Sequence, residues 1–109
     1  MDSFEIIMTP DATTDLLELR DYISDSLLAP DTALFYIESI RKKINTLSQM
    51  PDRVKPVEIE PWKSIGIRKI MAKNFYIYYR INQKDKQVYI LNILYNRIDQ
   101  LRQLAAKFK

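Results

Sequence analysis

The side chains able to do chemistry in this 109-residue chain are those of arginine, lysine, tyrosine, aspartate and glutamate, because the sequence contains no cysteine and no histidine. Thiolate and imidazole nucleophiles, and metal sites built on them, are therefore excluded. A metal-independent ribonuclease can work with what remains: a carboxylate activates a 2′-hydroxyl, fixed cations hold the phosphate, and a phenol protonates the leaving oxygen. The candidates are Glu58 or Glu60 as base, Arg68 and Arg80 as phosphate clamps, and Tyr95 as acid or stacking platform.

Each of these residues also has a structural interpretation. An arginine on a strand is often a solvated cross-strand partner, and a tyrosine on a strand often packs against its neighbours. Trp62 follows a proline-rich stretch, where it is either a core plug or an anchor for another protein. The residue types alone leave both interpretations open.

Charge is divided unevenly along the chain. Residues 1–40 carry one basic and nine acidic side chains, whereas residues 41–109 carry sixteen basic and five acidic ones. If the cations of the second part gather on an uncovered side of the sheet, they form a surface that attracts phosphates or acidic proteins. The alternative is that these lysines and arginines only solvate the edges of helices and strands.

The first part of the chain predicts a strand and two helices. Residues 4–8 are rich in strand formers, and Thr9-Pro10 is a helix start signal, with a capping hydroxyl before a proline. The helix that follows, up to about residue 27, is amphipathic, and we expect its acidic residues, Asp15 among them, to lie mostly away from its apolar stripe. A break at residues 28–31 separates it from a second helix that ends before Met50-Pro51. Two helices joined so closely predict an antiparallel hairpin.

The second part predicts a loop, three strands and a short helix. Prolines favour an extended connection over residues 52–62, and strand patterns follow at 65–71, 75–81 and 88–94. The three strands should form an antiparallel meander. Its last member is apolar on both faces apart from Asn92, as expected of a central strand or of one covered by a partner. Residues 99–109 have the pattern of a short terminal helix.

Alternation along the middle strand divides its side chains between two faces. One face is expected to be core, and the other wet and reactive. The core face holds Phe75, Ile77, Tyr79 and Ile81, and the other holds Tyr76, Tyr78, Arg80 and Asn82.

Together these elements predict one α+β domain over residues 1–109. The order strand-helix-helix-strand-strand-strand-helix favours two layers, with the helical hairpin on an antiparallel-dominated sheet of about four strands. No apolar run is long enough to span a membrane and no leader pattern is visible, so we expect a cytoplasmic protein without a membrane anchor. No metal site or cofactor is expected.

Several of these residues also carry a family resemblance that extends over essentially the whole chain. Gly66-Ile67-Arg68-Lys69-Ile70, then Lys73 to Ile81, resembles the strand hairpin of the RelE/ParE superfamily of toxins from bacterial type II toxin–antitoxin modules, and Val88 to Arg97 is similar to its last strand. The amino-acid sequence of this strand hairpin resembles that of the ParE-like branch more than that of the RelE-like branch. Tyr95 and Asn96 stand where many relatives have His and Gly, and the segment 101–109 has no Tyr like the one that RelE-type nucleases carry there.

The resemblance implies three hypotheses. The ParE-like one is a toxin that binds DNA gyrase without chemistry of its own, a role associated with plasmid stabilisation. The RelE-like one is a ribosome-dependent messenger RNA endoribonuclease. The third is a non-toxic remnant that only binds an antitoxin. All three imply a cognate antitoxin protein as partner, and none implies direct sequence-specific DNA binding.

The resemblance and the residue chemistry together give the candidate site residues. If the chain is a nuclease, the catalytic candidates are Arg68, Arg80, Tyr95 and Arg97, with Lys69 among the basic residues of the hairpin. The candidates for binding the target or the antitoxin are Trp62, Lys69, Lys73, Tyr76, Tyr78 and Arg102.

Overall fold

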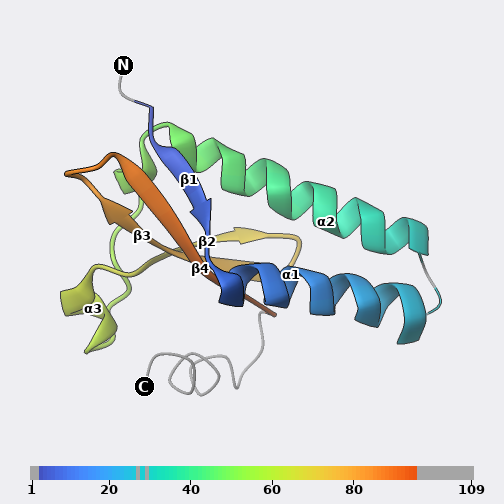
Figure 1. Ribbon diagram of the computed structural model, residues 1–109. Helices are drawn as coiled ribbons and strands as arrows, with labels where there is room; N and C mark the ends of the chain where they lie inside the picture. The colour runs from blue at the N-terminus through green and yellow to red at the C-terminus, as the bar shows by residue number, and fades with distance from the viewer. Residues whose placement is uncertain (1–2, 27, 29, 96–109) are drawn as a thin grey trace.

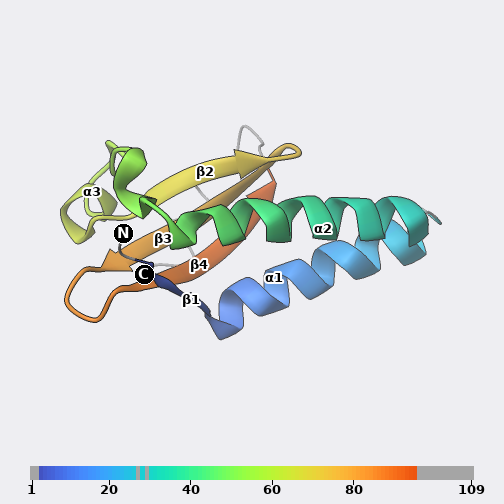
Figure 2. The same cartoon turned by 90° about the horizontal axis from the view of Figure 1, so that it is seen from above.

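Two long helices lie side by side against one face of a four-stranded sheet (Figures 1 and 2). The computed structural model describes residues 3–26, 28 and 30–95. The elements are β1 (Glu5–Met8), α1 (Pro10–Asp21), α2 (Pro30–Asn45), α3 (Trp62–Ile65), β2 (Arg68–Ala72), β3 (Phe75–Asn82) and β4 (Gln87–Tyr95). The predicted terminal helix at 99–109 lies outside the described residues.

The strand order in the sheet is β1-β4-β3-β2. β1 pairs with β4 in parallel, and the pairs β4–β3 and β3–β2 are antiparallel. The α+β class, the helical hairpin and the meander are therefore confirmed, as is the central position of β4. The helices cover one face of β4 and residues 57–67 pack against the other, which is why its sequence is apolar on both faces.

The helix start signal at Thr9-Pro10 is also confirmed. The Thr9 hydroxyl accepts a hydrogen bond from the Ala12 N–H at 3.3 Å and donates one to the Ile90 carbonyl at 2.6 Å. One side chain thus caps α1 and ties its first turn to β4. After Asp21 the helix widens into a π-helical turn, Tyr22–Ser26, and α2 ends at Asn45, followed by a short 3₁₀ turn at Thr46–Ser48.

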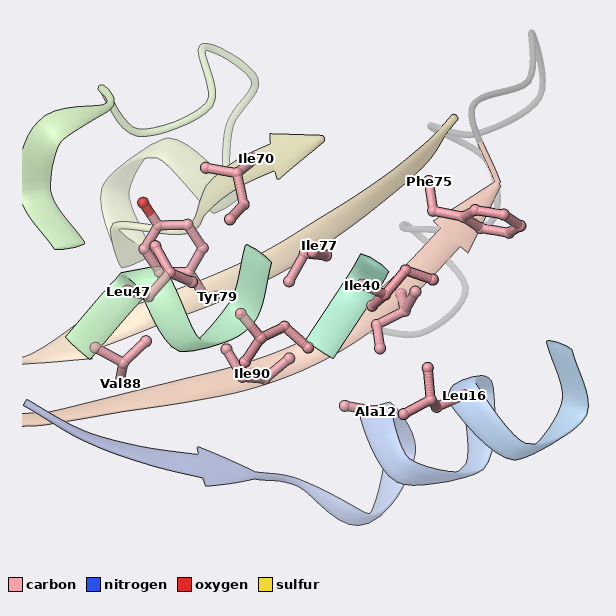
Figure 3. Packing of buried hydrophobic residues seen from close by; sticks show 12 residues of the cluster. Ala12, Leu16, Ile40, Leu47, Ile70, Phe75, Ile77, Tyr79, Val88 and Ile90 are labelled. Atoms are coloured by element: carbon pink, nitrogen blue, oxygen red, sulfur yellow. The ribbon is translucent and has the colours of Figure 1, made fainter. Parts of the chain in front are cut away.

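The main core fills the space between the helices and the sheet (Figure 3). Ile77 at the centre of β3 and Ile40 of α2 are both fully enclosed. The other residues of this cluster are Ala12, Leu16, Ile44, Leu47, Ile70, Phe75, Tyr79, Val88, Ile90 and Ile93. The expected core face of β3 is confirmed by this packing.

The expectation of an uncovered opposite face is wrong for most of the sheet. Tyr78, expected on that wet face, is only 1% exposed, because residues 55–67 fold over it. A second cluster forms there from Trp62, Ile67, Tyr78 and Leu94, with Val57, Tyr76 and Leu91 packed against it. Arg80, and Met71 opposite Tyr76, stay exposed on this face.

The covering segment is held close to the sheet by backbone pairing. The Val57 N–H donates to the Ile67 carbonyl at 2.8 Å, and Pro56 forms an isolated bridge with Arg68. Prolines keep this stretch extended and leave few N–H groups that need partners. The segment is therefore a third layer of the fold, whereas the sequence pattern predicted only an extended connection on the surface.

The predicted strand at 65–71 is displaced. Residues Trp62–Ile65 form a helical turn instead, and the strand runs from Arg68 to Ala72. Gly66, the only glycine in the chain, ends the turn at φ 86°, where its N–H reaches the Trp62 carbonyl at 3.0 Å. Glycine adopts this left-handed geometry without strain, so it ends the helical turn and does not continue a strand. The predicted extended connection also contains a 3₁₀ turn at Pro51–Arg53.

Candidate functional site

Arg68 and Arg80 lie on opposite faces of the sheet. Arg68 is the cross-strand partner of Tyr79, so its side chain lies on the helix side, where its guanidinium donates to the Val54 carbonyl. Arg80 follows Tyr79 in β3 and faces the other way, with its guanidinium carbon 5.5 Å from the centroid of the Tyr89 ring. These two guanidinium groups cannot hold one phosphate between them.

Tyr95 is remote from Arg80 as well. It ends β4 opposite Phe75, on the helix side, and its ring packs edge-on against Phe75 at a centroid distance of 5.2 Å. Arg80 pairs with Tyr89, farther back along β4. The structure therefore does not bring the three described nuclease candidates together, and Arg97 lies outside the described residues.

The two glutamates proposed as bases sit on the exposed covering segment. Glu60 accepts hydrogen bonds from the Ser64 hydroxyl at 2.7 Å and the Ser64 N–H at 3.0 Å, which hold the pKa of its carboxyl below the usual range. A general base working near neutral pH needs the opposite shift. The Glu58 carboxylate lies 3.8 Å from the Lys63 ammonium, a pair open to solvent. Both contacts are local to the turn around α3.

The expected single cationic surface is not found among the described residues. Lys69 lies over the Tyr76 ring on the covered face, whereas Lys73 lies over Phe35 of α2, on the helix side. Arg53 donates to carbonyls at the end of the second helical segment, those of Thr46 and Gln49. Strand alternation and turn positions distribute these cations around the molecule, so a charge excess along the sequence does not become one surface patch.

Three of the predicted contact residues do meet. Trp62, Lys69 and Tyr78 line a pocket of about 400 Å³ between the covering segment and the sheet, together with Lys55, Pro56, Val57, Glu58 and Ile59. Tyr76 lies beside it, with its ring 6.2 Å from that of Tyr78. We call this the Trp62 pocket. Arg102 lies outside the described residues.

A larger groove opens on the helix side. It has a volume of about 700 Å³ between the far end of the helical hairpin and the turn joining β2 to β3, and Lys73 is on its rim. Its lining includes exposed Tyr22 and Tyr95, which are 55% and 44% accessible. We call this the hairpin groove. Exposed aromatic rings around an apolar groove mark a surface suited to another protein.

Two adjacent tyrosines of β3 have buried hydroxyls with different partners. The Tyr79 hydroxyl donates to the Pro51 carbonyl at 2.7 Å on the helix side. Within the part of the chain that the structure describes, the Tyr78 hydroxyl, on the opposite face, has no hydrogen-bond partner, and neither has the indole N–H of Trp62. Burial raises the pKa of both tyrosines to about 12.

Replacing each tyrosine with phenylalanine should change stability in opposite directions. Tyr78→Phe removes a buried hydroxyl that is unpaired and should raise the free energy of unfolding by about 1 kcal/mol. Tyr79→Phe removes a hydrogen bond and leaves the Pro51 carbonyl without this donor, so unfolding should become easier by about 1 kcal/mol. Urea denaturation of the two variants measures both changes. A loss of stability in both would contradict the assignment of an unpaired Tyr78 hydroxyl.

Stability should also fall at alkaline pH. The unfolded chain loses tyrosine protons near the ordinary value of 10, whereas folded Tyr78 and Tyr79 hold theirs to about 12. Between pH 10 and about 12 the folded state therefore binds more protons than the unfolded chain. The free energy of unfolding keeps its full value below pH 10 and falls as the pH rises through this window, by about 1 kcal/mol for each tyrosine at the middle of the window. Urea midpoints measured across the window test this, and each Tyr→Phe variant should show a shallower fall than the wild type.

Sequence reasoning missed one buried polar pair. Asp15 is 9% exposed, and its carboxylate accepts hydrogen bonds from the Ile93 N–H at 2.9 Å and the Asn92 amide at 3.2 Å. It does so where β4 continues beyond Ile90, the last of its residues that pairs with β1. The signal was present, because Asp15 lies three residues after Ala12 and four before Leu19, on the apolar stripe, and Asn92 interrupts an apolar strand.

Neither a membrane-crossing helix nor a metal-binding group of side chains occurs in the part of the chain that the structure describes. The helices there are too short or too polar to cross a bilayer. No three carboxylates among those residues lie close enough to hold a metal ion.

Comparison with known proteins gives a consistent result. A family model described as the ParE toxin of the type II toxin–antitoxin system parDE matches residues 6–100. No curated protein sequence matches the chain significantly.

Solved structures share the fold. One is the chromosomal ParDE toxin–antitoxin system from P. aeruginosa, with a TM-score of 0.73, 22% identity and coverage of 89% of this chain and 100% of that one. Another is the toxin–antitoxin complex RelBE2 from Mycobacterium tuberculosis, with a TM-score of 0.64, 23% identity and coverage of 87% and 93%. A mutant of the E. coli toxin RelE in the free state has a TM-score of 0.58, 11% identity and coverage of 96% of each chain.

Proposed function

The chain belongs to the ParE toxin family of type II toxin–antitoxin systems, and we propose that it is a single-domain toxin that arrests growth by binding DNA gyrase. It acts in the cytoplasm without a cofactor, it does not read DNA sequence, and a cognate antitoxin neutralises it. The family match over residues 6–100 is the observation that carries this proposal.

The site geometry supports binding over catalysis. A phosphate clamp needs its cations on one side, and Arg68 and Arg80 face opposite sides of the sheet. Acid–base catalysis near neutral pH needs a base whose pKa is raised towards that range, and hydrogen bonds from Ser64 instead hold the pKa of Glu60 below its usual value. The described residues thus form pockets and no catalytic constellation, as a toxin that works by contact requires.

The proposed antitoxin contact is supported by the hairpin groove. Two of the structures reported above are a ParDE toxin–antitoxin system and a RelBE2 toxin–antitoxin complex. The groove, about 700 Å³ with exposed Tyr22 and Tyr95, suits the apolar face of a helical or extended segment. Acidic residues on that segment would complement the basic second part of this chain.

The test is to express the full chain in bacteria with and without its antitoxin. The purified chain is also added to DNA gyrase with DNA, and separately to a purified translation mixture. Growth arrest that the antitoxin relieves, with gyrase-linked DNA breaks and intact messenger RNA, is the expected result. Cleavage of ribosome-bound messenger would overturn the proposal in favour of a RelE-like endoribonuclease, and unimpaired growth would overturn it in favour of a non-toxic antitoxin-binding remnant.

Arg80→Ala separates the two toxic activities further. A nuclease that uses Arg80 as a transition-state cation should lose about 2.7–4 kcal/mol of transition-state stabilisation and with it most cleavage. Arg68→Ala is the matched control, because that guanidinium donates to the Val54 carbonyl on the other face. Under our proposal neither variant has a cleavage activity to lose.

A further inference from the structure

We infer that the Trp62 pocket binds an aspartate or glutamate side chain of a protein partner. This inference rests on one part of the proposed function, namely that the chain acts by contact with other proteins. It adds the chemical group that one of those contacts recognises, at a site on the opposite face of the sheet from the hairpin groove.

The pocket has the size and walls of a side-chain receptor. Its volume of about 400 Å³ lies between the covering segment and the strands β2 and β3. Pro56, Val57, Ile59 and the Trp62 ring supply apolar walls, so a partner's methylene groups can be buried beside them. The second cluster, which includes Trp62 and Tyr78, keeps this wall in place.

Two buried donors in this wall have no acceptor among residues 3–26, 28 and 30–95. Trp62 is 8% exposed and Tyr78 is 1% exposed, yet the indole N–H and the phenol O–H make no hydrogen bond to these residues. Burying a donor without a partner costs free energy, and an acceptor that enters the pocket and bonds to the donor recovers that cost. Both residues line the same pocket, so a group with two acceptor oxygens, such as a carboxylate, is chemically complementary to their two donors.

The charges around the pocket favour a negative occupant. Lys69 places its ammonium 4.4 Å from the centroid of the Tyr76 ring, and within the described residues neither it nor Lys55 forms an ion pair. Glu58, also on the lining, lies 3.8 Å from Lys63 with its side chain 77% exposed. Two lysines against one screened carboxylate leave the lining with a net positive charge.

A phosphate fits this pocket less well than a carboxylate does. Phosphate sites in proteins are commonly built from free backbone N–H groups and guanidinium forks. Here the N–H groups of Val57, Lys63 and Ser64 are already bound to Ile67, Ile59 and Glu60, and no arginine is on the lining. Neutral indole and phenol donors in apolar walls instead match a carboxylate carried on a hydrocarbon stem.

The test uses the full chain and Trp62, its only tryptophan. The probe is N-acetyl-glutamate amide, titrated while the Trp62 emission and the single indole N–H resonance are recorded. We expect saturable changes in both signals, with N-acetyl-glutamine amide and inorganic phosphate each binding at least about tenfold more weakly, since hydrogen bonds to a charged group are the stronger ones.

Variants locate the binding. Tyr78→Phe keeps the ring and should weaken binding of the carboxylate probe about tenfold, and Lys69→Met should weaken it and reduce its dependence on salt. Tyr89→Phe is the matched control, because its hydroxyl bonds to Gln87 outside the pocket, and it should bind as the wild type does. Circular dichroism confirms that each variant is folded.

Three results would overturn the inference: no saturable change with the carboxylate probe, equal binding of the amide or of phosphate, or unchanged affinity in Tyr78→Phe. Growth arrest and gyrase-linked DNA breaks are measured separately, so these titrations can fail while the proposed toxin function stands, and the reverse also holds.

Discussion

Replacing Trp62 with alanine is expected to release the covering segment, residues 55–67, from the sheet at a cost of about 3–5 kcal/mol. Trp62 is the largest residue of the second cluster, and the other buried members, Ile67, Tyr78 and Leu94, pack around it. None of the residues of the main core belongs to this cluster. The loss should therefore be concentrated on one side of the sheet.

Hydrogen exchange measures this directly. In Trp62→Ala the N–H groups of Val57 and Ile67, which bond to Ile67 and Trp62 carbonyls, should lose protection, while those of Ile77 and Ile90 in the main core keep most of theirs. Trp62→Phe, which keeps an aromatic ring, is the control and should retain most of the protection. Uniform loss across both clusters would show that they form one cooperative unit.

Replacing Asp15 with alanine is expected to cost about 3 kcal/mol, although aspartate on a helix is usually replaceable. Its carboxylate satisfies the Ile93 N–H and the Asn92 amide inside the protein, and removal leaves both donors buried without that acceptor. The contact also joins α1 to the irregular point of β4, so its loss should loosen both.

Thermal or urea unfolding gives the size of this effect. Glu18→Ala is the matched control, because Glu18 is an exposed carboxylate on the same helix. It should change stability by less than about 0.5 kcal/mol. Asp15→Asn keeps one acceptor oxygen and should lie between the two. If Asp15→Ala were as mild as Glu18→Ala, the two hydrogen bonds to β4 would not contribute to stability.

The proposed function connects these two regions. Trp62→Ala removes the wall of the Trp62 pocket, and Asp15 lies on the lining of the hairpin groove. The variants therefore perturb opposite faces of the sheet, and comparing their effects on antitoxin binding and on gyrase-linked DNA breaks would show which face serves which partner.

Several features were determined by the sequence itself because their causes are local. Thr9-Pro10 starts a helix since a hydroxyl and a proline act on the next few N–H groups. The spacing of Ile40 and Ile44 marks the buried side of α2, and the apolar run from Val88 to Leu94 marks a central strand. The hairpin motif from Gly66 to Ile81 was enough to indicate the toxin family that the comparison then showed.

The site was decided only by the tertiary structure, because its contacts join residues far apart in the chain. Arg68 and Arg80 face opposite sides because the turn at Lys73 and Asn74, both with positive φ, sets the strand register. Asp15 is buried by groups 77 and 78 residues away. Strand alternation predicted an exposed Tyr78, yet residues 55–67 return to cover it. Local patterns specify which side of an element is apolar, whereas burial of its other side depends on which distant segment packs there.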